Sequence, residues 1–158
     1  MKDNWVQLTK NYPINIRIII GSYFEIECLR RDYHNAIITT EQDCKKNNYN
    51  IITGFYTITH GKTINPENQR RFRISYVLLD MIRTSGMPTG IELCSDLNLF
   101  YKYMNDFVGA RRGLSSAINY LRICKAKWIE TLDIPDSEKL KMHERMAHSY
   151  ETTLSWYV

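Results

Sequence analysis

The sequence predicts a mainly α-helical protein: a helical bundle of four to five helices with one long central helix and a small extended or β-hairpin insertion. Apolar residues recur every three or four positions over residues 97–132, which is the spacing of one helix face. Helix start and stop signals flank several other segments. The length of 158 residues and the hydrophobic content of 44% indicate one helical domain spanning residues 1–158.

The first long helix is predicted over residues 14–38. Pro13 precedes it, where the missing N–H of proline costs nothing, and apolar residues keep helical spacing from Ile16 to Ile37. The isoleucines from Ile14 to Ile20 also alternate as in a strand, but the helical pattern is longer and is therefore preferred.

Helical periodicity is lost between Asp43 and Asn65. Residues 45–48 are polar and indicate a loop, whereas residues 51–64 are rich in Thr and Ile and contain two glycines. This composition favours a short hairpin or an irregular excursion over a helix.

Two further helices are predicted between this insertion and the long helix. The first begins near Asn65, because positions 65–67 hold a capping Asn, a first-turn Pro and a first-turn Glu. It ends at the stop signal in residues 85–88. Thr89 and Glu92 have the spacing of a capping box. We therefore expect the next helix to begin near Gly90 and to run into the long one.

The long central helix would be about 54 Å in length, so another part of the chain or a second copy must cover it. Arg111 and Lys125 are the seam positions that are not apolar. Gly109 and Gly113 each cost up to about 1 kcal/mol inside a helix, so a loop between two ordinary helices is the alternative. The apolar seam consists of Leu97, Phe100, Met104, Phe107, Leu114, Ile118, Leu121, Trp128 and Leu132.

A break at residues 134–137 precedes a last helix that is predicted to reach the C-terminus. Residues 1–5 lack the pattern of a secretory signal, and the most apolar stretch, residues 14–20, is too short to span a bilayer. We expect no membrane association and a cytoplasmic protein, or one of the host cytoplasm or nucleus if it is viral. The widely spaced cysteines are expected to be reduced, buried thiols: Cys28, Cys44, Cys94 and Cys124.

The histidines do not indicate an enzyme. His143 and His148 are five residues apart, which turns their imidazoles about 140° from one another on a helix and excludes a shared metal. Arg30 and His34 are similar to the pair in helical RNases of the HEPN class, which use an arginine and a histidine with four to six residues between them, but only three residues lie between them here, so the spacing departs from that pattern. HEPN-like RNase activity is therefore a remote alternative, and we expect no catalysis and no cofactor.

Basic residues gather in an acid-free window from Phe107 to Ile129, which carries five of them against a net charge of +4 for the chain. Tyr103 and Tyr120 are near these basic residues in the sequence and could stack on bases, whereas Trp128 is expected in the core. A second basic cluster opens the helix predicted after Asn65. The candidate contacts to nucleic acid or another anionic partner are Arg111, Arg112, Arg122, Lys125, Lys127, Arg70, Arg71 and Arg73.

These features favour a non-catalytic protein-interaction or assembly module that self-associates or binds a protein partner. The first alternative is a nucleic-acid-binding accessory protein, for RNA or single-stranded DNA, that uses the basic helix face. The second is a viral or phage accessory protein that inhibits a host factor.

Overall fold

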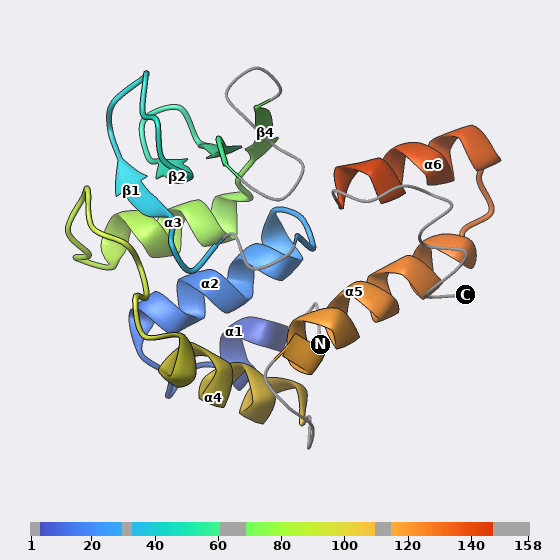
Figure 1. Cartoon of the computed structure of the whole chain (residues 1–158), viewed down its shortest axis with the longest axis horizontal. Coiled ribbons are helices and arrows are strands. Elements are labelled where there is room, and N and C mark those ends of the chain that lie inside the picture. The colour runs from blue at the N-terminus through green and yellow to red at the C-terminus, as the bar shows by residue number, and fades with distance from the viewer. Residues whose placement is uncertain (1–3, 30–32, 61–68, 110–114, 147–158) are drawn as a thin grey trace.

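The computed structural model describes residues 4–29, 33–60, 69–109 and 115–146. Within these ranges it contains six helices and one mixed four-stranded sheet, so the protein is α/β (Figure 1). The prediction of a helical bundle with only a small hairpin is therefore wrong. The helices are α1 (Trp5–Leu8), α2 (Ile14–Glu25), α3 (Tyr76–Thr84), α4 (Leu97–Val108), α5 (Ser115–Glu130) and α6 (Asp136–Arg145), and the strands are β1 (Ile37–Thr39), β2 (Asn48–Asn50), β3 (Phe55–Ile58) and β4 (Arg70–Arg73).

The strands lie in the order β1-β2-β3-β4, with β1 parallel to β2 and the other neighbours antiparallel. Tyr49 of β2 is in register with Tyr56 of β3, which is in register with Phe72 of β4. Paired residues share a face, so these three buried rings lie together on the inner face of the sheet. The opposite face, termed the outer face, carries Asn48, Asn50, Phe55, Thr57, Arg71 and Arg73.

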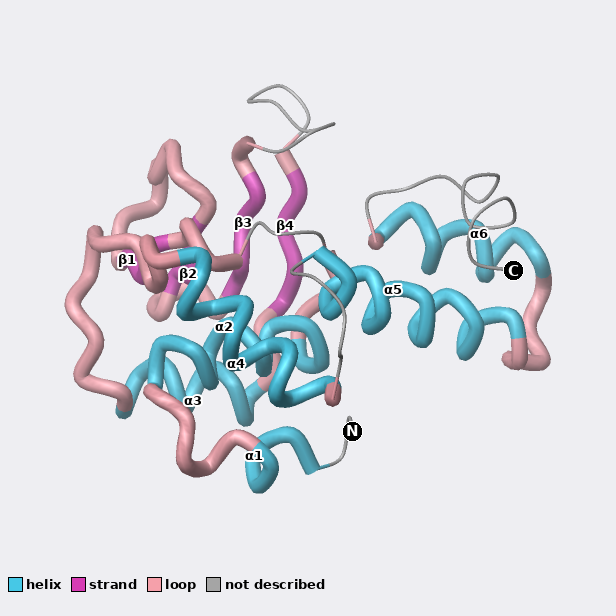
Figure 2. The backbone as a smooth tube through the Cα atoms, turned by 60° about the horizontal axis from the view of Figure 1, so that its bottom comes forward, coloured by secondary structure: helices cyan, strands magenta, loops and turns pink. Residues whose placement is uncertain are grey.

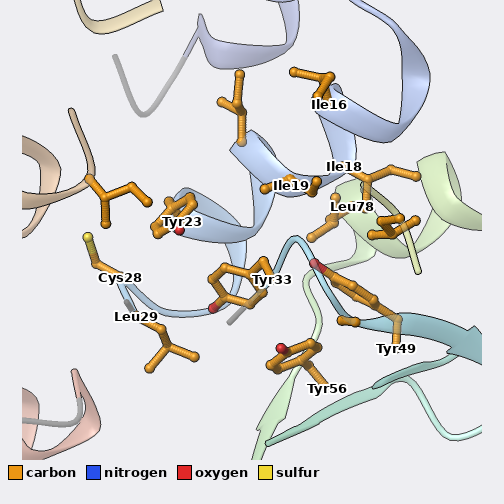
Figure 3. Packing of buried hydrophobic residues seen from close by; sticks show 14 of the residues in the cluster. Ile16, Ile18, Ile19, Tyr23, Cys28, Leu29, Tyr33, Tyr49, Tyr56 and Leu78 are labelled. Carbon is orange, nitrogen blue, oxygen red and sulfur yellow. The ribbon is translucent and has the colours of Figure 1, made fainter. Parts of the chain in front are cut away.

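The core lies between the inner face of the sheet and the isoleucine-rich side of α2 (Figure 3). The ring of Tyr56 is 4.8 Å from that of Tyr33 and 4.7 Å from that of Tyr49, measured between centroids. Tyr33 donates its hydroxyl proton to the backbone oxygen of Glu27 at 2.6 Å, which satisfies the phenol inside the core. The side chain of Tyr33 is fully buried.

Helix α2 begins after Pro13 as predicted, but it ends at Glu25, and residues 37–39 form strand β1 instead of the end of a helix. All three residues of β1 are buried. Periodicity alone cannot distinguish a short, fully buried strand from a buried helix segment, which is why the pattern misled here. The strand alternative for residues 14–20 is also wrong, because they belong to α2.

The extended insertion was predicted correctly in outline, since β2 and β3 form an antiparallel pair, but β4 lies where a helix was expected after Asn65. Residues 70–73 pair with β3, and α3 begins only at Tyr76. Pairing with β3 satisfies the backbone groups on one side of β4, and Phe72 is buried against the core. Local capping signals contain neither gain. Residues 61–68, with the predicted start signal, lie outside the described part of the chain.

The predicted helix start near Gly90 is wrong. The backbone N–H groups of Gly90 and Leu93 donate to the oxygens of Ile38 and Ala36, so this segment runs beside the region of β1. Helix α4 begins at Leu97, after Asp96, whose side chain caps the helix. A tertiary pairing has again replaced a local helix signal.

The long central helix is in fact two helices, α4 and α5, which contact each other. Gly109 ends α4 with a φ of 67°, a left-handed conformation that glycine adopts at little cost. The loop alternative is therefore confirmed at Gly109, and the single 97–132 helix is wrong. Residues 110–114 lie outside the described residues.

The last helix, α6, follows Pro135, but it already begins at Asp136, inside the predicted break at residues 134–137. It runs alongside α5 (Figures 1 and 2). Buried His143 places its Nε2 2.9 Å from Oε1 of Glu130, and Lys139 donates to the backbone oxygen of Glu130 at 3.1 Å. These contacts hold α6 on the end of α5. In the described ranges, no helix combines the length and apolar character that crossing a membrane requires.

Candidate functional site

The acid-free window of the sequence does not form one basic helix face. Arg111 and Arg112 lie outside the described residues. Arg122 was expected to reach phosphates, but its side chain is only 1% exposed, and its Nη1 donates to the backbone oxygen of Cys28 at 3.2 Å. That expectation is wrong, because the side of α5 that carries Arg122 faces the segment after α2.

The outer side of α5 carries a cation and an aromatic ring in contact. Nζ of Lys125 lies 4.8 Å from the centroid of the Trp128 ring, and Lys127 is exposed nearby. Trp128 is 46% exposed, so its expected place in the core is wrong. The rotation of α5 that buries Ile129 and Ala126 leaves Trp128 on the surface.

The second predicted cluster, Arg70, Arg71 and Arg73, lies on strand β4 rather than on a helix. The Cζ atoms of Arg71 and Arg73 are 4.4 and 5.1 Å from the centroid of Phe55, which shares the outer face with them. Arg70 belongs to the other face and donates a hydrogen bond to the backbone oxygen of Glu144 in α6. The alternation of the strand thus spreads the three cations around the edge of the sheet.

A groove of about 540 Å³ separates β4 from α6. Figures 1 and 2 both place β4 as the strand nearest to α6. Lys141 and Arg145 are four residues apart, which places them on the same side of α6, and both line the groove. Its charged residues, which define the β4–α6 groove, are Arg70, Arg71, Arg73, Lys141, Glu144 and Arg145.

A smaller cleft of about 260 Å³ lies on the other side of Arg145 and is lined by Lys125, Glu25 and Glu27 as well. Arg145 therefore connects Lys125 with the arginines of β4, although the sequence placed those residues in separate clusters. The two glutamates offset the cations in this cleft. The β4–α6 groove, with five cations and one carboxylate, is the more favourable of the two for an anion.

Sequence reasoning missed Lys141 and Arg145. Their spacing of four residues was a visible signal of a shared helix side, but charge pairs of this kind are common on solvated helices. What makes them part of a site is the position of α6 opposite β4, which involves residues about seventy positions apart in the chain.

The described residues do not contain a group of three or more His, Cys, Asp or Glu side chains placed to hold a metal ion. His143 contacts Glu130 and His34 stacks near Phe100, with ring centroids 6.1 Å apart. Arg30 of the HEPN-like pair and His148 of the histidine pair lie outside the described part of the chain.

Comparison of the chain with family models, with curated proteins and with solved structures finds no match. What the site can do therefore follows from its own geometry. A groove with five cations and one carboxylate, two of whose arginines lie over an aromatic ring, suits an extended ligand whose negative charges repeat along its length.

Proposed function

We propose that the protein is a non-catalytic nucleic-acid-binding protein whose β4–α6 groove contacts the phosphate backbone. The observation that carries this proposal is that two elements distant in sequence bring five cations to one groove with a single carboxylate. Arginine matches phosphate geometry with two parallel N–H donors, and four of the five cations are arginines.

Several of these cations are held in place before any ligand binds. Phe55 lies beneath the guanidinium groups of Arg71 and Arg73, and Arg145 is paired with Glu27. A side chain that is already ordered loses less conformational entropy on binding than a freely rotating lysine. This organisation supports a binding role over that of a merely solvated charged surface.

Fluorescence anisotropy with a labelled single strand of about 12 nucleotides tests the proposal. If about four phosphates are neutralised, affinity should fall about 50-fold between roughly 50 and 200 mM salt. Failure to bind at the lower salt concentration contradicts the proposal.

Charge reversal locates the binding surface. The double variant Arg71→Glu/Arg73→Glu should weaken binding at least about tenfold at low salt. Its matched control is Lys10→Glu/Lys102→Glu, which changes the net charge equally at exposed positions near α1 and on α4, far from β4 in Figure 1. An equal loss in both variants would mean that net charge, rather than the groove, governs binding.

An acidic protein segment is the other polyanion that this groove fits. Polyglutamate added as a competitor separates the two partners. Displacement of the oligonucleotide at equal charge concentration would favour a protein ligand and contradict nucleic-acid binding. Self-association stays a prediction, although the continuous helix that suggested it is absent. Light scattering measures the mass in solution and so tests whether the chain self-associates.

A further inference from the structure

A pocket of about 440 Å³ lies on the outer face of the sheet and adjoins the β4–α6 groove. Arg71 lines both cavities, so the groove and the pocket share one cation. The remaining lining is dominated by amide and hydroxyl side chains rather than by charges. The lining residues used below are Gln42, Asp43, Asn48, Thr57, Gln69 and Arg71.

Asn48 is one of two buried asparagines that line this pocket, the other being Asn50. Its side chain is on the outer face, and the residue is only 4% exposed. Nδ2 donates to the backbone oxygen of Lys46 at 2.8 Å. An amide side chain also carries an acceptor oxygen, so Asn48 can take a hydrogen bond from a ligand that brings a donor into the pocket.

The wall beside Asn48 is preorganised. Asn50 donates to the backbone oxygen of Glu41 at 3.0 Å and accepts the N–H groups of Ile52 and Thr53 at 2.9 and 3.0 Å. These bonds fix the segments on both sides of the pocket. The cavity is therefore a formed feature of the fold, of a size that small-molecule sites have.

We propose that this pocket receives one unpaired nucleobase of the strand whose phosphates lie in the β4–α6 groove. Amide side chains offer both donors and acceptors, as does the edge of a base. The opposite charges of Asp43 and Lys45 offset each other in the pocket lining, and Arg71 is shared with the groove. The uncharged base therefore belongs in the pocket, and the phosphates belong in the groove, where the cations gather.

The inference rests on the proposed function and narrows the ligand to a single strand. A base inside a duplex has its hydrogen-bonding edge paired and cannot enter the pocket without leaving the stack. Phe55, which lies beneath Arg71, adds an apolar surface to the outer face.

The experiment compares a single strand with an abasic strand of the same length, which carries the same phosphates and no bases. The intact strand should bind about tenfold more tightly, because the pocket and the groove then act together. The variant Asn48→Leu keeps the side-chain volume and removes the amide. It should lower the affinity for the intact strand to that of the abasic strand and leave abasic binding unchanged.

A second variant distinguishes the loss of a pocket contact from misfolding. Gln69→Leu alters an exposed pocket residue, and it should have the same effect as Asn48→Leu in a protein whose thermal unfolding is unchanged. Equal affinity of the intact and abasic strands overturns the base pocket and leaves the proposed function standing. If the intact strand binds more tightly than the abasic strand and neither variant reduces this difference, the assignment to this pocket is overturned. Binding of a duplex with the same affinity as the single strand overturns it as well. Absence of binding to both strands overturns the proposed function as well.

Discussion

Arg145 of α6 pairs with Glu27 in the segment after α2, with 3.3 Å between Nε and Oε2. The Glu27 side chain is 6% exposed and that of Arg145 is 60% exposed. The other carboxylate oxygen, Oε1, accepts the N–H of Cys28 at 3.1 Å. This arrangement ties the end of α6 to the body of the protein and holds one cation of the β4–α6 groove in place.

The two ends of this pair should respond differently to mutation. Arg145→Met leaves a buried carboxylate without its cation and should lower the free energy of unfolding by about 1–3 kcal/mol. Glu27→Gln removes the charge but keeps an acceptor for the N–H of Cys28, so its loss should be smaller. Urea denaturation of both variants measures the difference, and a larger loss in Glu27→Gln would contradict this account.

The contact between His143 and Glu130 should matter for binding although neither residue lines the groove. His143→Leu removes the 2.9 Å contact that holds α6 on α5 and should destabilise the protein by about 1–2 kcal/mol. Because α6 carries Lys141 and Arg145, oligonucleotide affinity should fall as well. Lys139→Met, which removes a bond from a less buried side chain to Glu130, is the control with the smaller expected effect. Amide hydrogen exchange in α6 that is unchanged by His143→Leu would be evidence against the role of this contact.

Gly21 is required by the close approach of Trp5. A Cβ atom at position 21 would lie 2.5 Å from Cη2 of the indole, whose Nε1 donates to Oε1 of Glu25 at 2.8 Å and anchors the ring. Gly21→Ala should therefore lower stability by about 1–2 kcal/mol, although alanine is the better helix former. The smaller ring in Trp5→Phe makes room, so the double variant should lose less than the sum of the two single losses. Additive losses in thermal or urea unfolding would rule out the steric explanation.

The four cysteines are free thiols that should differ in reactivity. Burial raises the pKa of Cys28 from 9.0 to about 12, and burial also raises the pKa of Cys94. Cys44 and Cys124 are only half-buried. A thiol-specific reagent near pH 8 should therefore modify Cys44 and Cys124 in the native protein and all four cysteines after denaturation, because the thiolate is the reactive form. Rapid native labelling of Cys28, identified by mass spectrometry, would contradict its burial.

The raised pKa of Cys28 also predicts an alkaline limit to stability. Between pH 9 and pH 12 the folded state keeps this proton, whereas the unfolded state releases it. The contribution of the neutral thiol is fully present below about pH 9 and is lost as the pH rises towards 12. Cys28→Ala should therefore lose less stability than the native protein between those pH values, as measured by urea denaturation at each pH.

Helix boundaries that depend on the backbone of one or two residues could be predicted from the sequence. Pro13 and Pro135 precede helices because proline has a fixed φ and lacks an N–H. Gly109 ends a helix because its left-handed conformation suits glycine. These effects act over a few bonds and do not require knowledge of the rest of the chain.

Strand β4 and the rotation of α5 were not predictable in this way. The sequence of β4 contains one apolar residue, Phe72, among arginines, and it becomes a strand because β3 offers a pairing edge and the core offers a place for the ring. In α5 two rotations compete, and the one observed buries Arg122 and exposes Trp128. Contacts made by distant segments outweigh the intrinsic preference of a short segment for one structure.

Local signals in the sequence were enough to predict the start of α2 after Pro13, the extended nature of the insertion, and three of the five groove cations, Arg70, Arg71 and Arg73. That these three arginines share a groove with Lys141 and Arg145 follows from the packing of α6 opposite β4. The two kinds of interaction act over different distances along the chain. Caps and turns act through neighbouring peptide groups, whereas a groove depends on the packing of elements that meet only after the whole chain has folded.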